Sequence, residues 1–183
     1  LGLLAARPLA GLFDITLWSW LWPCMIVSVL LLSAAYAASA VSFRNLFAKH
    51  FGAGGLFVVF YALMPLGIEG TYWVSASSRI IPGLLFCALA AGRFSRYLES
   101  GRRGPLVGAL VLQFLTFCFY EQTAVLSCAL HILLALLAVR ERRERSAAAF
   151  LCILVAGAYF GVTALAGPSP LYDGRTEIIL PKS

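Results

Sequence analysis

Six apolar stretches, separated by short polar segments, set the pattern of this chain. They cover approximately residues 16–41, 54–68, 79–93, 105–120, 123–139 and 147–167. The longest has enough residues to cross a hydrocarbon core of roughly 30 Å as a helix. The pattern therefore predicts an all-α fold, a polytopic transmembrane helix bundle of about six spans. Residues 1–183 would form one transmembrane helical region that ends in an external tail at 168–183.

The stretch from Pro105 to Val139 decides the predicted topology. Its flanks are basic, GRRG before it and RERRER after it, so both ends are expected on the same side of the membrane. As a single helix its 35 residues would be about 52 Å long, far more than the bilayer core. We therefore predict a helical hairpin that turns at Tyr120, Glu121 and Gln122.

Ten of the fourteen lysines and arginines fall into three clusters between the apolar stretches. The clusters are Arg44 with Lys49; Arg93, Arg96, Arg102 and Arg103; and Arg140, Arg142, Arg143 and Arg145. Basic residues concentrate on the cytoplasmic side of membrane proteins, so the N-terminal end and the C-terminal tail are predicted to be noncytoplasmic. Despite the net charge of +6, the arginines lie beside apolar spans, which favours membrane lipid over nucleic acid as the partner.

Composition agrees with a membrane protein. Hydrophobic residues make up 61% of the chain and charged residues 12%, about half the share of a soluble domain. All five cysteines lie in apolar stretches and none forms a CxxC pair, so we expect small buried side chains without a metal site or cofactor. The chain begins at Leu1 without a signal-peptide pattern, and we expect a fragment of a larger membrane protein.

The predicted external segment 69–79 is the densest in polar groups on its side. Tyr72 and Trp73 offer aromatic faces to a sugar ring, and Glu69 offers a carboxylate for sugar hydroxyls. The guanidinium of Arg79, where a helix is predicted to begin, forms a two-pronged hydrogen bond with phosphate groups. The structural alternative is an interfacial aromatic belt in which Arg79 pairs with Glu69 or Glu121.

Glu121 stands out because it interrupts a long, nearly uncharged stretch. A carboxylate in hydrocarbon is costly, so it either faces a substrate or lies in a wet turn near the headgroups. Gln113 and His131 are placed in the two arms of the predicted hairpin. We expect them to hydrogen-bond between helices, as structural residues.

The segments EGTYWVSASSRIIPGLLF and FYEQTAVL resemble parts of polytopic bacterial glycosyltransferases of the GT-C type. The resemblance rests on the Tyr72–Trp73 pair, Arg79 with Pro82, and the turn at 120–122. It implies an enzyme of the bacterial inner membrane that transfers a sugar from a polyprenyl-phosphate donor to a glycan, lipid or protein acceptor at the noncytoplasmic face.

The resemblance also implies roles for individual residues. It makes Glu69 and Glu121 candidates for the catalytic carboxylate, and it implies substrate binding by Tyr72, Trp73, Arg79, Tyr120 and Gln122. The catalytic base and any metal dependence stay unassigned. The alternative is a nonenzymatic polytopic membrane protein, either a transporter segment or an assembly subunit, in which the same residues pack helices or line a pathway.

Overall fold

The computed structural model describes residues 7–52, 55–63, 74–140 and 149–165. In these residues all regular structure is helical, which confirms the all-α prediction. The N-terminal part contains two short helices, α2 (Pro8–Phe13) and α3 (Ser19–Leu21), joined by a π-helical turn, η1 (Asp14–Trp18). The remaining helices are α4 (Met25–Phe51), α5 (Gly55–Leu63), α7 (Val74–Ser100), α8 (Arg103–Phe117), α9 (Glu121–Arg140) and α10 (Ala149–Leu165).

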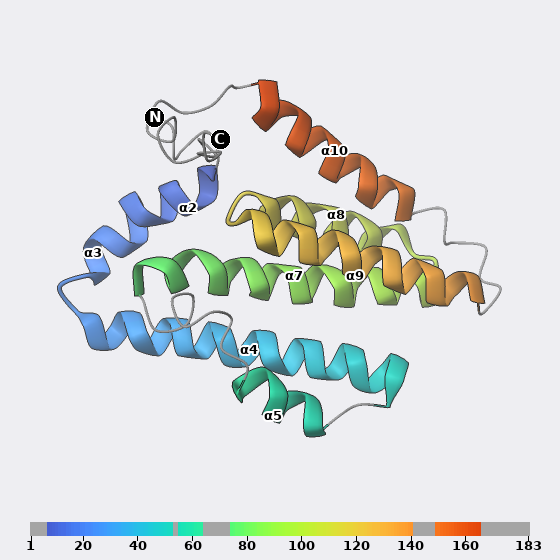
Figure 1. Cartoon of the computed structure of the whole chain (residues 1–183), viewed down its shortest axis with the longest axis horizontal. Helices are drawn as coiled ribbons and strands as arrows, with labels where there is room; N and C mark the ends of the chain where they lie inside the picture. The colour runs from blue at the N-terminus through green and yellow to red at the C-terminus, as the bar shows by residue number, and fades with distance from the viewer. Residues whose placement is uncertain (1–6, 53–54, 64–73, 141–148, 166–183) are drawn as a thin grey trace, which may run out of the picture.

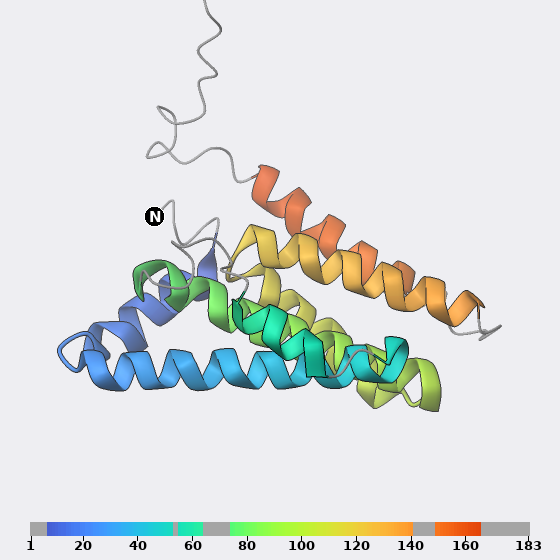
Figure 2. The same cartoon turned by 60° about the horizontal axis from the view of Figure 1, so that its bottom comes forward.

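From α4 onward, successive helices run in alternate directions, as Figure 1 shows. Helix α7 lies centrally and packs against α4, α8 and α9, whereas α10 packs on α8 and α9. Helix α5 packs against α4, which the turned view in Figure 2 makes visible. The short connections enforce this alternation. Gly101, between α7 and α8, has a φ of 67°, a backbone conformation that glycine adopts easily and other residues rarely do.

Most basic residues of the described chain, all except Arg7 and Arg79, lie towards one end of the bundle. Helices α4, α7 and α9 all end there, and α8 begins there (Figure 1). This end therefore holds Lys49 of α4, Arg96 of α7, Arg102 before α8 and Arg140 of α9. We call it the basic end. The opposite end, with α2, η1 and the first turns of α7 and α9, is the N-terminal end.

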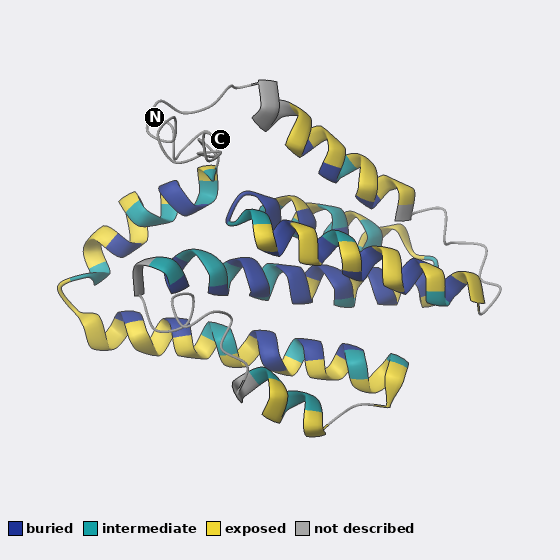
Figure 3. Ribbon diagram, in the orientation of Figure 1, coloured by how far each residue is buried: buried dark blue, intermediate teal, exposed yellow. Residues whose placement is uncertain are grey.

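The interior is built largely from small and hydroxyl-bearing residues. Buried side chains of this kind include Ser28, Ser39, Ala40, Cys87, Ala88, Ala90, Ala91, Ala109, Thr116, Thr123, Ala124, Ser127, Ala135 and Ala138. Phe94, Phe117 and Phe119 are also fully buried, but many large apolar side chains, among them Ile26, Leu30 and Leu154, are exposed on the outside (Figure 3). Small residues let helix backbones approach closely, an arrangement common in bundles that lie in lipid.

Two helices among the described residues, α4 and α9, are long and apolar enough to cross a membrane. Less than half of the most apolar part of each is buried, 28% for α4 and 44% for α9. The structure does not support six spans. Helix α8 has 15 residues and is about 22 Å long, short of the roughly 30 Å hydrocarbon core. Helix α5 is shorter still, and α7 is interrupted by charged residues.

Two predicted helix boundaries are wrong. The stretch 16–41 is not one helix, because the chain breaks after α3 and α4 starts only at Met25. Pro23 lies in this break, since proline lacks the N–H that a continuing helix needs. Helix α4 then continues to Phe51 and ends at Gly52, whose φ is 68°. Cys24, predicted to be buried, is exposed in the break, whereas Cys87, Cys118 and Cys152 are buried as predicted.

The third predicted span begins earlier and ends later than 79–93, because α7 runs unbroken from Val74 to Ser100. Arg79 is therefore inside a helix and not at its start. Pro82 also lies inside α7, where its ring is accommodated without ending the helix. The ranges 54–68 and 147–167 correspond to α5 and α10, and their outer residues lie beyond the described ranges, as does the tail.

The predicted helical hairpin is confirmed. Helices α8 and α9 are joined by the short connection Cys118–Tyr120, and Glu121 is already the first residue of α9. The turn is thus slightly earlier than predicted. Thr123 reinforces it, since its hydroxyl donates to the Tyr120 carbonyl at 2.7 Å. Such local side-chain bonds stabilise a helix start without a glycine or proline in the turn.

Candidate functional site

A two-pronged ion pair joins the N-terminal segment to the α8–α9 turn. Arg7 Nε lies 2.9 Å from Glu121 Oε1, and its Nη2 lies 2.8 Å from Oε2. The same guanidinium lies 4.4 Å from the ring centre of Tyr120. The Arg7 side chain is 20% exposed and the Glu121 side chain 44%, so the pair is only partly shielded from its surroundings. Glu121 therefore satisfies its charge within the protein.

Backbone and ring contacts fix the same segment in place. The N–H groups of Leu9 and Ala10 donate to the Cys118 carbonyl at 3.2 and 3.4 Å. The Phe13 ring meets the edge of Phe119 at a centroid distance of 5.1 Å. Helix α2 is thus held on the α8–α9 turn by several independent contacts.

A second ion pair ties η1 to the first part of α7. Arg79 Nη2 donates to Asp14 Oδ2 at 2.9 Å, and both side chains are 27% exposed. Asp14 is the first residue of the π-helical turn. Such turns are rare and often occur at functional sites. The two ion pairs and the Phe13–Phe119 contact all lie at the N-terminal end of the bundle.

Two N–H donors in this region are buried and have no acceptor among the described residues. They are Nε of Arg79 and Nε1 of Trp18. Trp18 belongs to η1 and packs in one cluster with Ile81 of α7, so both donors lie where η1 meets α7. A buried donor without a partner costs free energy, and an oxygen-rich ligand such as a phosphate would satisfy it.

The polar residues of the hairpin lie deep in the bundle. Gln113 of α8 and His131 of α9 are almost fully buried, at 0% and 1% exposure. His131 Nδ1 lies 2.7 Å from the Ser127 carbonyl, and its ring packs 5.0 Å from that of Phe94. Neither amide atom of Gln113 has a hydrogen-bond partner among the described residues. Burial is as predicted, but neither residue forms the predicted hydrogen bond between helices among the described residues. The His131 bond lies within α9, and His131 Nε2 has no partner there.

The structure brings together some of the predicted site residues. Arg79, Tyr120 and Glu121 lie at the N-terminal end, whereas Gln122 is exposed on α9. Three further candidates, Glu69, Tyr72 and Trp73, lie outside the described residues. The suggested pairing of Arg79 with Glu121 is wrong, because Arg7 occupies that carboxylate.

The partners of these residues were missed by sequence reasoning. Asp14 lies 65 positions before Arg79 and Arg7 lies 114 positions before Glu121. No local spacing rule connects residues so far apart. The only available signal was that each is a rare charge on the predicted noncytoplasmic side.

Within the described residues, no three His, Cys, Asp or Glu side chains are placed to hold a metal ion. Comparison with protein-family models, curated proteins and solved structures gave no match for this chain.

Proposed function

We propose that the chain is the membrane-embedded helical part of a transferase that uses a polyprenyl-phosphate-linked sugar at the noncytoplasmic face. One observation supports this most directly. Arg79, the residue assigned by resemblance to the donor phosphate, has a buried Nε–H without a described acceptor. A second such donor, Nε1 of Trp18, belongs to η1, whose Asp14 pairs with Arg79. The reaction class rests on the GT-C resemblance.

The distribution of side chains supports embedding in a membrane. Large apolar residues cover the outer faces of α4, α8, α9 and α10, whereas serines, threonines and alanines fill the interior. A soluble monomer rarely exposes so much contiguous apolar surface. With α4 and α9 as spans, the basic end would face the cytoplasm and the N-terminal end the opposite side.

In the proposed reaction an acceptor hydroxyl attacks the anomeric carbon of the sugar, and the polyprenyl phosphate leaves. The guanidinium of Arg79 would stabilise the charge that develops on the departing phosphate. Asp14 would orient the guanidinium through Oδ2, which lies 2.9 Å from Arg79 Nη2. Its Oδ1, which takes no part in that ion pair, would accept the hydroxyl proton. Glu121 is less suited to that role because its two oxygens already bind Arg7.

A nonenzymatic membrane subunit is the second candidate. It is favoured by the pairing of both carboxylates: Glu121 with Arg7 and Asp14 with Arg79. In that case the ion pairs would serve only to clamp α2 and η1 onto the bundle.

Substitution of Arg79 with lysine separates the two candidates. Lysine keeps the charge and can still pair with Asp14, but it lacks the planar fork and the Nε–H. The transferase proposal predicts a roughly tenfold to hundredfold loss in donor turnover, the equivalent of one charge-assisted hydrogen bond. The measurement is single-turnover transfer from a set of polyprenyl-phosphate sugars by folded protein.

Arg102→Lys is the matched control, because Arg102 is exposed at the basic end. Thermal unfolding of both variants checks that they are folded. If the two variants bind and turn over the donors equally, Arg79 has no part in phosphate binding. The second candidate, in which the ion pairs only hold α2 and η1 on the bundle, then explains the structure better.

A further inference from the structure

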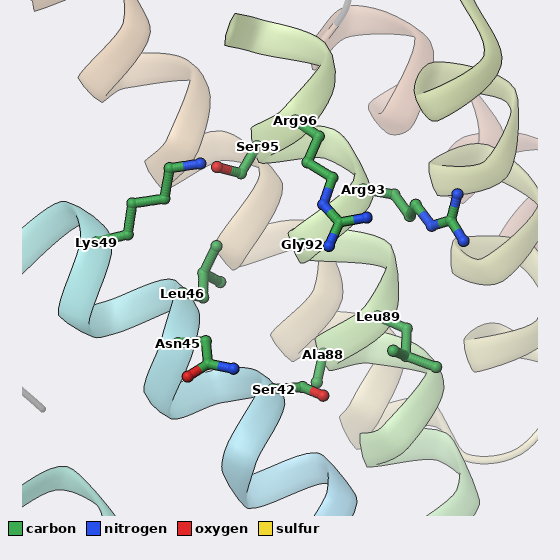
Figure 4. Close-up of a pocket in the computed structure, with 10 residues that line it drawn as sticks. All are labelled: Ser42, Asn45, Leu46, Lys49, Ala88, Leu89, Gly92, Arg93, Ser95 and Arg96. Atoms are coloured by element: carbon green, nitrogen blue, oxygen red, sulfur yellow. The ribbon is translucent and has the colours of Figure 1, made fainter. Parts of the chain in front are cut away.

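A cavity of about 350 Å³ lies between α4 and α7 at the basic end, far along both helices from Arg79. Figure 4 shows the residues that line it. They are Ser42, Asn45, Leu46 and Lys49 of α4, and Ala88, Leu89, Gly92, Arg93, Ser95 and Arg96 of α7. The volume falls in the range typical of small-ligand sites.

Small residues keep this space open. Ala88 and Gly92 are one turn apart on α7, and a Cβ added to Gly92 would meet no atom within 4 Å. Leu46 and Ala88 are buried and form an apolar floor. The two helices therefore pack closely at Ala88 and leave a gap one turn farther on.

The polar groups around this gap are mostly hydrogen-bond donors. Lys49 reaches from α4 towards α7, and the guanidinium of Arg96 lies beside Gly92, as Figure 4 shows. Asn45 and Ser42 add an amide and a hydroxyl from α4. The Ser95 hydroxyl lies 2.8 Å from His50 Nε2, which fixes its position at the edge of the cavity.

The positive charge of the cavity is only partly compensated. Lys49 forms an ion pair with Glu99. Neither Arg93 nor Arg96 forms an ion pair with a described residue, although they lie three positions apart on the same helix. The Arg93 side chain extends away from α4 towards α8, so Arg96 is the uncompensated charge beside the gap between α4 and α7 (Figure 4).

We propose that this cavity binds the phosphate group of an anionic ligand. Arg96 supplies the planar fork, Lys49 a point charge and Asn45 a neutral donor, a set that matches the several oxygens of a phosphate. The Ser42 hydroxyl lines the cavity but donates to the Ala38 carbonyl at 2.8 Å. Basic pockets between helices at the cytoplasmic side of membrane proteins bind anionic lipid headgroups in this way. The site is independent of the proposed transferase reaction, which is assigned to the other end of the bundle.

The Lys49–Glu99 ion pair predicts the direction in which phosphate affinity changes when Glu99 is replaced. A bound phosphate competes with Glu99 for the Lys49 ammonium and is repelled by its carboxylate. Glu99→Gln should therefore tighten phosphate binding. Arg96→Gln should weaken it by about tenfold to hundredfold, the effect of losing one charge-assisted contact.

The test uses the full chain in two preparations. In phosphatidylcholine bilayers, binding of spin-labelled phosphatidic acid reports a lipid headgroup as the source of the phosphate. In detergent, the rise in thermal unfolding temperature with inorganic phosphate reports a soluble source. Binding in either preparation, weakened by Arg96→Gln and strengthened by Glu99→Gln, supports the site and identifies the source.

Two matched controls make the result specific. Arg102→Gln removes the same charge from an exposed residue of the same cluster but outside the cavity. Gly92→Leu fills the gap without changing charge, and Gly157→Leu makes the same change in open space on α10. The proposal predicts that only Arg96→Gln and Gly92→Leu lose binding. Equal losses in Arg96→Gln and Arg102→Gln, or no phosphate binding by the wild type in either preparation, would overturn it.

Discussion

Replacing Gln113 with leucine should stabilise the protein. The Gln113 side chain is completely buried, and neither its amide oxygen nor its amide nitrogen has a hydrogen-bond partner among the described residues. Leaving such a group unpaired costs about 1–3 kcal/mol. Leucine has a similar size and no polar atoms, so repacking should cost less than the unpaired amide does. We therefore expect the free energy of unfolding to rise by about 1–3 kcal/mol.

The assay is denaturant unfolding in mixed micelles, where reversibility is checked by refolding. Gln122→Leu is the matched control, since Gln122 is exposed and its replacement should change stability by no more than about 0.5 kcal/mol. His131→Leu should stabilise less than Gln113→Leu. It also removes an unpaired buried atom, Nε2, but it loses the bond to the Ser127 carbonyl and the ring contact with Phe94. A loss of stability in Gln113→Leu would refute the reasoning. It would mean that the amide is satisfied in the membrane, for instance by an ordered water molecule.

Two more predictions concern the α8–α9 turn. Gly83→Ala should destabilise the protein by about 1–3 kcal/mol, because the new Cβ would lie 2.8 Å from Thr123 Oγ1. In a Thr123→Ala background, which itself loses the bond to the Tyr120 carbonyl, Gly83→Ala should cost less in thermal unfolding than in the wild type. Gly157→Ala, which enters open space, should not destabilise. In maleimide labelling with peptide mapping, exposed Cys24 should react readily and Cys118 slowly, because burial raises the pKa of the Cys118 thiol to about 11. The labelling rate of Cys118 should increase about tenfold per pH unit below that pKa, since the thiolate is the reactive form. Equal labelling rates of Cys118 and Cys24 at neutral pH would show that the α8–α9 turn is open.

The features that the sequence predicts well are those with a local cause. The hairpin follows from basic flanks around a stretch too long for one crossing, and α8 and α9 confirm it. The burial of Gln113 and His131 follows from their position in apolar arms. The break at Pro23 was the main local error. The predicted span 16–41 runs through this proline, but the helix restarts after it, at Met25.

The features that depend on tertiary contacts could not be predicted. Arg79 was singled out as an exceptional charge, but its partner Asp14 comes from a distant π-helical turn. The cavity at the basic end was missed for a similar reason. Arg96 was interpreted as one member of a loop cluster, whereas α7 continues through it and sets it opposite Lys49 of α4. Helix ends in such cases are decided by packing partners and not by local composition.

The ion pair between Arg7 and Glu121 has a consequence for the biosynthesis of the protein. The two residues are 114 positions apart, so the whole of α8 must be translated before the ion pair can form. At about 5–20 residues per second, that interval is roughly 6–23 s. Arg79 is translated before Glu121, so Asp14 can pair with it within this interval. Arg7 must wait for Glu121, its partner in the α8–α9 turn. We therefore expect the N-terminal segment to dock only after the α8–α9 turn has formed, so that its final position depends on a complete hairpin. If translation stalls before Glu121 emerges from the ribosome, α2 should stay accessible to protease. A residue more than a hundred positions after α2 thus controls its protection.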